Sequence, residues 1–464
     1  MSIWLPHLKD RTGPKYLQIV EAMAEDIAEG RLDVGTRLPP YRELAYQLGI
    51  SPNTASRAYT EAVKRALLRG ETGRGTFVRP PGETSRTDAP NTLQRNNTGP
   101  IDLSRNLPLA GAAEPYIRRI LKDISAEAGF AALLDYQTDD DLRHHSEAGI
   151  LWLKMCGLEA SSETLVTIMG GQHGLLCTLM GVLRPGDLLL TESLTYPPVC
   201  SIAEQLGLHI ATVEMDAEGA IPESFSDLCK RAKPKAFYLT PTLQAPTTVT
   251  LSEKRRQAIA EIAQRHDVLL IEDDVFGPLK TDSAAPLAML APDHTVYITS
   301  LSKAVAPGLR VGFLRAPARL IPALRHAVNL SVWMTPPLML EVAARVISDG
   351  TVLELVAHQR RTAERRQSLA RLILNRVDFV SDPFGFHLWM PLPPGRRADI
   401  LRAQCLKQDV LVSEARSFAI RQSEAPEAIR LCLSHEISEA RLEKGLRIVA
   451  HLMHLAPSVS TMEI

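Results

Sequence analysis

The sequence predicts a multidomain protein: a small N-terminal α+β domain, then an α/β domain with a mainly parallel sheet that ends in a smaller α+β part. Two patterns predict this order. Residues 14–79 contain three amphipathic helical segments and a hairpin, and apolar strand-like runs alternate with helical stretches from about residue 101. The length of 464 residues suits two or three domains. We expect domains at residues 1–79 and 101–464, joined by a flexible linker at 80–100 that is rich in Pro, Gly and polar residues.

The composition excludes several classes of protein. Hydrophobic residues make up 45% of the chain and charged residues 23%, which is ordinary for soluble globular proteins. No run approaches the roughly 18 to 20 apolar residues of a membrane span, and "MSIWLPHLKDR" lacks the pattern of a secretion signal. The six cysteines are scattered without a CxxC pair, which predicts reduced core thiols and no zinc site. We therefore expect a cytoplasmic protein without membrane contact.

The first domain begins with three helical patterns. "GPKYLQIVEAMAEDIAEG" has an apolar stripe that ends at Gly30, and "LPPYRELAYQLG" has Pro40 at its start and Gly49 as its stop. In "SPNTASRAYTEAVKRALL", Ser51 is a natural N-cap and Pro52 fills the first turn. The short turn before this third helix is typical of a helix-turn-helix.

A basic hairpin completes this domain. "LLRGETGRGTFVRP" predicts two short strands about a Gly-rich turn with Arg74 at its tip. Between residues 31 and 79, nine basic and four acidic residues leave a net charge of +5, which favours a polyanionic partner. The alternative is a small helical module that binds protein or dimerises. The order of cap, turn and hairpin favours a winged helix-turn-helix instead.

The stretch "GTRLPPYRELAYQLGISPNTASRAY…GRGTFV" resembles the DNA-binding domain of GntR-type bacterial regulators. The resemblance covers roughly residues 14–79 and implies that the partner is double-stranded DNA. By the same resemblance, the candidate DNA-binding residues are Arg42, Ser51, Asn53, Thr54, Arg57 and Arg74.

Seven apolar runs in the second domain predict strands. Helical stretches such as "LSEKRRQAIAEIAQRH" separate several of them, which indicates a mainly parallel sheet covered on both faces. The last hundred or so residues mix both patterns, so we expect a large part at about 101–345 and a small part at about 346–464. The predicted strands are "ETLVTIMGG", "DLLLTES", "LHIATVEM", "KAFYLTP", "DVLLIEDD", "TVYITS" and "VGFLRAP".

Polar residues follow several of these strands, at the edge where an open parallel sheet binds ligands. "IMGGQHGLL" passes through two glycines into a helix, whose backbone amides could cradle a phosphate. "LLIEDDVFG" ends in three carboxylates, and "YITSLSKAVAPGLR" adds two hydroxyls, an amine and a guanidinium. A metal at Glu272–Asp274 is disfavoured, because no histidines lie at ligand spacing. The alternative for Lys303 is a surface lysine paired with a carboxylate.

One cofactor would use all of these groups. A phosphate needs a glycine turn, hydroxyls and an arginine; a pyridinium nitrogen needs a carboxylate; and an aldehyde needs a lysine. That combination describes pyridoxal 5′-phosphate (PLP).

Residues 101–464 resemble the fold-type I PLP-dependent aminotransferases, and their fusion to a GntR-like head resembles the MocR-like transcriptional regulators. By this resemblance Lys303 forms the internal aldimine and Asp273 pairs with the pyridine nitrogen. Tyr196 would stack on the ring, and Arg430 would bind the carboxylate of an effector. The resemblance assigns the phosphate to Gly171, Gln172, Ser300, Ser302 and Arg310. It also implies a homodimer.

The chain departs from the aminotransferase pattern at two places. "LQAPTT" has Ala245 and Thr248 where aminotransferases have the Asn and Gly of Asn-Pro-x-Gly. "EDDVFG" has Phe276 where a tyrosine is usual. The missing Asn and Tyr would hydrogen-bond the ring oxygen of the cofactor, so cofactor binding is expected but efficient transamination is not.

We therefore predict a DNA-binding regulator whose second domain binds PLP and senses an amine, an amino acid or PLP itself. The alternative is an active aminotransferase with an accessory DNA-binding domain. A third possibility is a repressor whose cofactor pocket is only a relic, which the retained Lys303, Asp273 and Arg310 disfavour.

Overall fold

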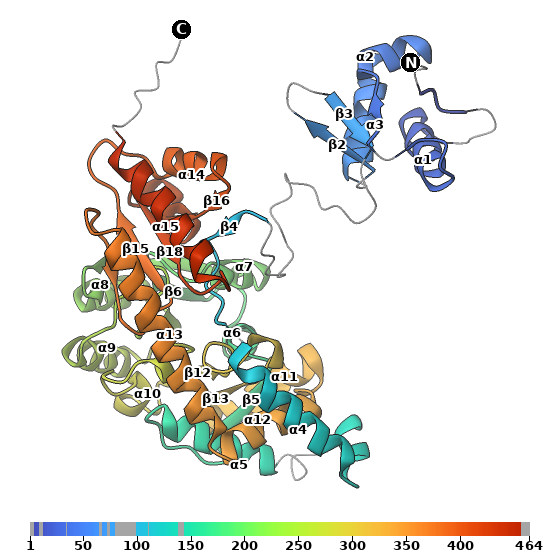
Figure 1. Cartoon of the computed structure of the whole chain (residues 1–464). Coiled ribbons are helices and arrows are strands. Elements are labelled where there is room, and N and C mark those ends of the chain that lie inside the picture. The colour runs from blue at the N-terminus through green and yellow to red at the C-terminus, as the bar shows by residue number, and fades with distance from the viewer. Residues whose placement is uncertain are drawn as a thin grey trace. The chain divides into compact units, whose positions relative to one another are not determined.

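The computed structural model describes residues 4–8, 13–33, 35–64, 67–71, 75–78, 99–109, 111–137 and 143–455. The chain divides into two compact units, Met1–Gln94 and Arg95–Ile464 (Figure 1). Arg74 and most of the predicted linker lie outside the described residues.

The first unit is the winged helix-turn-helix that the sequence predicts. Its three helices enclose a core around Ile19, Met23, Leu44 and Ala58, all fully buried. Its sheet is antiparallel in the order β1-β3-β2. The elements are α1 (Lys15–Ala28), β1 (Arg37–Leu38), α2 (Tyr41–Gln47), α3 (Pro52–Lys64), β2 (Leu68–Glu71) and β3 (Gly75–Val78).

The second unit is built on a seven-stranded sheet of order β5-β13-β12-β11-β10-β6-β7. Only β13 runs antiparallel to its neighbours, so the prediction of a mainly parallel sheet is confirmed. All seven predicted strands form. They are β5 (Leu165–Ile168), β6 (Leu188–Glu192), β7 (His209–Val213), β10 (Ala236–Leu239), β11 (Leu269–Asp273), β12 (Thr295–Ser300) and β13 (Gly312–Arg315).

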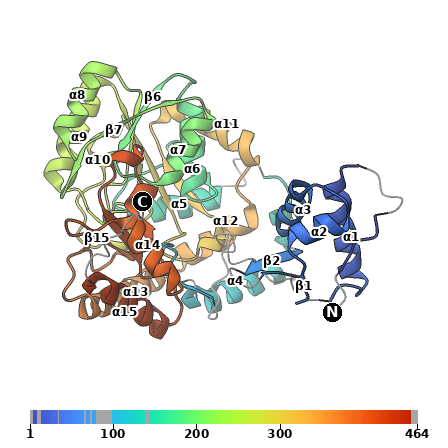
Figure 2. The same cartoon turned by 90° about the horizontal axis from the view of Figure 1, so that it is seen from above.

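Helices cover both faces of this sheet because its strands are apolar on both sides. One face packs against α6 (Gly171–Val182), α7 (Pro197–Gln205) and α11 (Ile321–Val332). The opposite face packs against α8 (Pro222–Ala232) and α9 (Glu253–His266). In Figure 2, β6 and β7 lie between these two helices and the first three. The remaining elements of the large part are α4 (Glu114–Ala126), α5 (Arg143–Met155), β8 (Met215–Asp216), β9 (Gly219–Ala220), α10 (Leu287–Leu290) and α12 (Pro337–Ser348).

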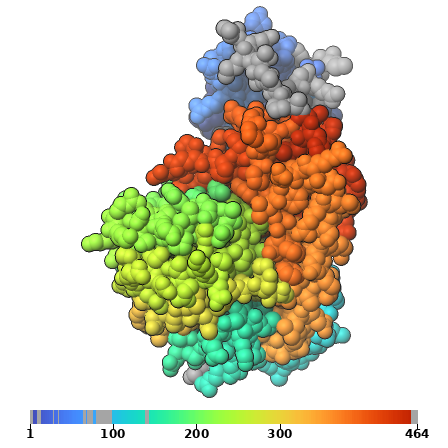
Figure 3. Space-filling view, turned by 90° about the vertical axis from the view of Figure 1, so that its left-hand side faces the viewer, coloured from blue at the N-terminus to red at the C-terminus, as the bar shows by residue number. Residues whose placement is uncertain are grey.

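The long helix α13 (Thr351–Ile373) leads into the small part, whose sheet has the order β14-β15-β18-β17. The surface of this part adjoins that of α8 to α10 (Figure 3). β4 (Ile101–Asp102), at the start of the unit, pairs in parallel with β16 (Val410–Leu411) and not with the large sheet. The other elements are β14 (Val380–Ser381), β15 (His387–Pro391), α14 (Ala398–Lys407), β17 (Ser413–Glu414), β18 (Ala428–Cys432) and α15 (Glu439–His454).

Among the described residues, no helix has both the length and the apolar character that a membrane span requires. The six cysteines are free in this structure, and four of them are buried.

Candidate functional site

The candidate cofactor residues meet at the carboxyl edge of the large sheet. β11 ends at Asp273 and β12 ends at Ser300, and the chain then turns through Ser302 and Lys303. α6 begins at Gly171, directly after β5 and the turn that follows it. Because parallel strands bring their carboxyl ends to one edge, residues far apart in the sequence form one site.

Asp273 is a buried carboxylate with one oxygen free to accept a hydrogen bond from a cationic group. Its Oδ2 accepts a 2.8 Å hydrogen bond from the hydroxyl of Tyr238, while its buried Oδ1 has no partner among the described residues. Burial, and to a lesser extent the charge of Asp274, raise the pKa of Asp273 to about 6, although the Tyr238 hydroxyl, the backbone N–H of Val275 and the positive charge of Lys303 act in the opposite direction. An N–H donor with a positive charge would satisfy Oδ1 and lower this pKa.

The two neighbouring carboxylates lie near the buried Arg256 instead, whose charge opposes the rise that burial causes in the pKa of each. Glu272 lies 3.4 Å from Arg256 and accepts the backbone N–H groups of Leu287 and Ala288. Asp274 Oδ2 accepts a 2.8 Å hydrogen bond from the Tyr297 hydroxyl, and its Oδ1, like that of Asp273, has no hydrogen-bond partner among the described residues. The described residues contain no cluster of His, Cys, Asp and Glu that could hold a metal ion. The carboxylate run therefore supplies one residue to the site and two to the core.

A glycine turn and an arginine form a cradle at the N-terminus of α6. Gly170 has φ +81°, and a Cβ there would lie 2.8 Å from Arg310 Nη2. That guanidinium donates to the Met169 carbonyl at 2.9 Å and to Ser302 Oγ at 3.5 Å. Helix N-termini with such donors bind phosphate groups. The sequence singled out Gly171 and Gln172, whereas the backbone conformation makes Gly170 the indispensable glycine.

Lys303 faces the centre of the site. Its Nζ donates to the backbone carbonyl of Asn106 at 2.5 Å and lies 5.1 Å from the centre of the Phe276 ring. Phe276 is buried, so the position where aminotransferases have a tyrosine presents only an apolar ring to this lysine.

Tyr196 precedes α7 and lies within electrostatic reach of the same groups. Burial and the charge of Asp273 raise its pKa to about 12, and Arg310 opposes this rise. An un-ionised, half-buried phenol ring at this place suits stacking on an aromatic ligand.

The loop after β10 keeps a particular shape despite its altered residues. Thr248 has φ +68° at the position where glycine is usual. Gln244, beside Ala245, turns its side chain into the protein: Nε2 donates to the Leu194 carbonyl at 2.6 Å, and Oε1 accepts the Thr247 hydroxyl at 2.7 Å. Neither Ala245 nor Phe276 offers a side-chain hydrogen bond at the site.

Two polar residues that the sequence did not single out, His387 and Asn106, lie beside this loop and Lys303. His387 on β15 is fully buried; its Nε2 donates to the Gln244 carbonyl at 3.1 Å, and its Nδ1 lies 3.0 Å from Asn106 Nδ2. Burial and the charges of Arg430 and Lys303 lower the pKa of His387 to about 3, so the imidazole is neutral. The only hint in the sequence was a histidine inside the apolar run "GFHLWMPLP".

Arg430 on β18 lies at the small-part side of the site. Its guanidinium is 4.5 Å from the Phe418 ring, and Nη2 donates to the Ser104 carbonyl at 2.5 Å. Its buried Nε has no hydrogen-bond partner among the described residues. An arginine with an unsatisfied edge is suited to bind a carboxylate.

In the first unit, the candidate DNA-binding residues cluster at the starts of α2 and α3. Ser51 caps α3 by accepting the Thr54 N–H at 3.2 Å, as predicted. Arg42, Asn53 and Arg57 are exposed. Arg57 lies 4.0 Å over the Tyr16 ring, which holds its guanidinium at the surface. Arg74 is outside the described residues.

The residues present fit PLP. The orphaned Oδ1 of Asp273 suits a protonated pyridine nitrogen, the Gly170–Arg310 cradle suits a phosphate, and Lys303 supplies the amine.

Comparisons with known families agree with this geometry. Residues 98–449 match the family "Aminotransferase class I and II", and residues 15–78 match "Bacterial regulatory proteins, gntR family".

Similar proteins of known sequence are regulators. The uncharacterized HTH-type transcriptional regulator YdeF of Bacillus subtilis is 28% identical over 97% of this chain and 96% of its own length. The probable rhizopine catabolism regulatory protein MocR of Rhizobium meliloti is 26% identical over 78% of this chain and 77% of its own. The pyridoxine biosynthesis regulator PdxR of Corynebacterium glutamicum is 28% identical over 79% of this chain and 78% of its own.

Solved structures of aminotransferases share the fold of the second unit. An archaeal alanine:glyoxylate aminotransferase superposes with a TM-score of 0.70 at 22% identity, covering 78% of this chain and 92% of that one. The α-aminoadipate aminotransferase LysN of Thermus thermophilus superposes with a TM-score of 0.69 at 21% identity, covering 77% of this chain and 92% of that one.

Proposed function

Because the chain belongs to the aminotransferase class I and II family and carries a GntR-type DNA-binding domain, as MocR-like regulators do, we propose that it is a ligand-responsive transcriptional regulator. Its second unit binds PLP and senses an amine, an amino acid or PLP itself. The occupied site then changes how the first units bind promoter DNA. Regulators of this kind act in the cytoplasm, and we propose that this chain acts there as a homodimer.

One observation supports the sensing role. The site keeps the residues that would bind the cofactor and lacks those that would hydrogen-bond its ring oxygen and so adjust the basicity of its imine. Lys303, Asp273 and the Gly170–Arg310 cradle converge at one edge of the sheet. The positions that would hydrogen-bond the ring oxygen present Ala245 and a buried Phe276. Each missing hydrogen bond to an ionised oxygen removes about 1.5–3 kcal/mol of stabilisation. Binding therefore remains favourable while rapid turnover is not supported.

The residues of the chain divide the work of binding. Bound PLP would supply an aldehyde that reacts with amines and an electron-withdrawing ring. Lys303 Nζ would anchor it, Asp273 would hold the proton on the pyridine nitrogen, and Arg310 would neutralise the phosphate. Tyr196 would cover the ring and exclude water. Arg430, with its unsatisfied Nε, would orient an effector through its carboxylate.

A second candidate is a working aminotransferase with an accessory DNA-binding domain. The retention of both Lys303 and Arg430 in one site favours it. Steady turnover of an amino acid with a 2-oxo acid, at rates typical of enzymes, would support this candidate over the sensor.

The test uses the full chain loaded with PLP and DNA from its own promoter region. Amines and amino acids are titrated while the near-visible absorbance of the cofactor and the affinity for DNA are followed in the same samples. We expect at least one ligand to change both signals, and Lys303→Ala to abolish the absorbance response. The proposal would be contradicted if the affinity for DNA stayed the same with every ligand tested and with or without PLP.

A further inference from the structure

We propose that residues 99–106, here called the strap, transmit occupancy of the effector site toward the DNA-binding unit. This inference rests on the proposed sensing function. The strap is the first described segment after the stretch that joins the two units in the sequence. Its inner end supplies backbone carbonyls to Lys303 and Arg430, the two residues expected to engage cofactor and effector.

The outer half of the strap is fastened to the small part. Arg441 on α15 donates to the carbonyls of Gly99 and Pro100 at 2.9 and 3.1 Å. The Ile101 N–H donates to the Asp409 carbonyl at 2.7 Å, and the Leu103 N–H donates to the Leu411 carbonyl at 2.8 Å. These backbone bonds join β4 to β16, so we expect the strap amides to be protected from exchange with solvent.

The inner half of the strap reaches the site. The Ser104 carbonyl accepts Arg430 Nη2 at 2.5 Å and the Ser413 hydroxyl at 3.1 Å. Two residues further on, the Asn106 carbonyl accepts Lys303 Nζ at 2.5 Å. Arg430 and Lys303 are cationic donors, so their bonds to the strap are of the stronger, charge-assisted kind.

A carboxylate on Arg430 would compete with the strap for the same nitrogen. A guanidinium binds a carboxylate bidentately along the Nε/Nη2 edge or the Nη1/Nη2 edge, and both edges include Nη2. The orphaned Nε favours the first edge. A carboxylate there would neutralise the charge that strengthens the bond to Ser104 and place a second oxygen beside that carbonyl. The Ser104 anchor would weaken as a result.

The Lys303 anchor responds to a different event. When Nζ bonds to an aldehyde carbon, water leaves with the carbonyl oxygen and two of the three ammonium hydrogens. At most one N–H then remains on Nζ, so the bond to Asn106 is weakened by cofactor attachment. The two anchors therefore distinguish a cofactor-loaded site from one that also holds a carboxylate.

The probes for this idea are two oxyamines that condense with the aldehyde of PLP whatever the natural effector is. Aminooxyacetate carries a carboxylate and O-methylhydroxylamine does not. Amide hydrogen exchange is measured over residues 99–106 in the PLP-loaded full chain, with β10 in the large sheet as an internal reference. Either oxyamine releases Lys303 from the cofactor, so we expect O-methylhydroxylamine to slow strap exchange by restoring the bond from Nζ to the Asn106 carbonyl. With aminooxyacetate, whose carboxylate also weakens the Ser104 anchor, we expect strap exchange about tenfold faster than with O-methylhydroxylamine, the effect of losing one charge-assisted hydrogen bond.

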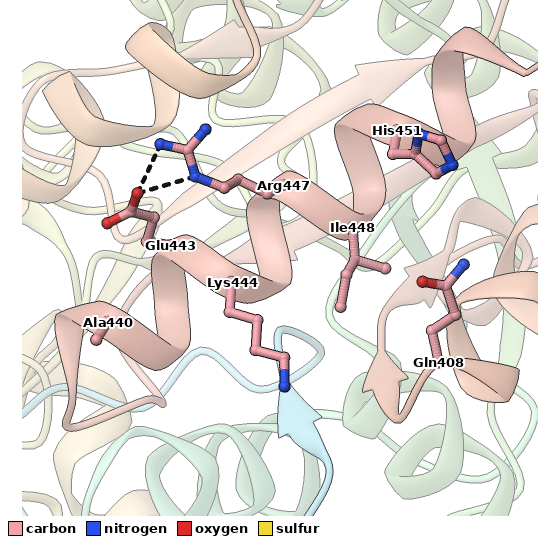
Figure 4. A pocket seen from close by; sticks show the side chains of 7 residues that line it. All are labelled: Gln408, Ala440, Glu443, Lys444, Arg447, Ile448 and His451. Atoms are coloured by element: carbon pink, nitrogen blue, oxygen red, sulfur yellow. Dashed lines mark hydrogen bonds and ion pairs between the residues drawn. The ribbon is translucent and has the colours of Figure 1, made fainter.

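Variants separate the anchor from its surroundings. Ser413→Ala removes one hydrogen bond to Ser104 without touching the cofactor residues, and we expect strap exchange to rise several-fold before any ligand is added. Arg447→Ala is the matched control. Arg447 donates both of its hydrogen bonds to Glu443, on the face of α15 that lines an open hollow of about 450 Å³ (Figure 4).

Identical strap exchange with the two oxyamines would overturn the inference, as would equal exchange in Ser413→Ala and Arg447→Ala. The affinity for promoter DNA, measured in the same samples, separates the two proposals. A change in DNA affinity without a change in strap exchange refutes the strap and leaves the sensor intact. A strap response without any change in DNA affinity refutes both, because the strap is proposed to transmit occupancy toward the DNA-binding unit.

Discussion

Tyr238→Phe should move the pH at which the protein loses its cofactor. The Tyr238 hydroxyl donates to Asp273 Oδ2 at 2.8 Å and thereby lowers a pKa that burial has raised to about 6. A hydrogen bond to a charged group contributes about 1.5–3 kcal/mol, and one pKa unit corresponds to about 1.4 kcal/mol. Loss of the hydroxyl should therefore raise the pKa of Asp273 by about one to two further units.

The direction in which cofactor affinity changes with pH depends on which protonation state of Asp273 binds the cofactor. The ionised carboxylate pairs with a protonated pyridine nitrogen, so affinity is present above the pKa of Asp273 and is lost as the pH falls through it. A plot of log affinity against pH bends at the pKa of the unliganded protein. In the wild type we expect this bend near pH 6, and in the variant about one to two units higher.

The assay is titration of the full chain with PLP, followed by absorbance at several values between about pH 5 and pH 9. Tyr297→Phe is the matched control, because this equally buried tyrosine donates at the same 2.8 Å to Asp274, one residue away. Both variants should lose comparable stability, since each leaves a buried carboxylate short of one donor. A bend that stays at the wild-type pH in Tyr238→Phe, or moves equally in Tyr297→Phe, would refute the reasoning.

Three further predictions test other parts of the chain. Gly170→Ala should weaken PLP binding about tenfold or more, because its Cβ would displace Arg310, whereas Gly308→Ala, with no atom within 4 Å, should bind normally in the same titration. Burial raises the pKa of Glu192 to about 7, so the proton stabilises the folded state and thermal stability should fall as the pH rises from about 5 to 8; Glu192→Gln should flatten this fall. Arg57→Ala should weaken promoter binding and reduce its salt dependence by about one unit of slope, as measured by titration at several salt concentrations.

Local patterns in the sequence predicted the elements because local physics forms them. Short apolar runs, several of them separated by helical stretches, indicated all seven strands of the large sheet, and the Ser51–Pro52 pair located the start of α3. Lys303 could be singled out because an amine in an apolar run needs a reason to be there.

The rest of the site depends on contacts between distant residues, which no local pattern encodes. β4 is two residues long and pairs with a strand more than 300 residues away, so nothing in "IDLSRNLP" indicated its place in the small part. The three carboxylates looked alike in "LLIEDDVFG", and only the neighbouring charges distinguish them: Lys303 for Asp273, and the buried Arg256 for Glu272 and Asp274.

The loop around Ala245 shows both kinds of determinant at once. Thr248 holds φ +68°, a conformation that costs a β-branched residue roughly 1–2 kcal/mol. Such strain persists only where the surroundings fix the backbone, and Gln244 does so through the Leu194 carbonyl and the Thr247 hydroxyl. The fold thus keeps the backbone shape that a glycine would adopt without strain, while the side chains beside the cofactor ring offer it no hydrogen bond. Such a site keeps the backbone shape and the residues that bind the cofactor but lacks the hydrogen bonds to its ring oxygen. It can therefore hold a cofactor and respond to a ligand, as a sensor must, whereas efficient catalysis would also need those hydrogen bonds.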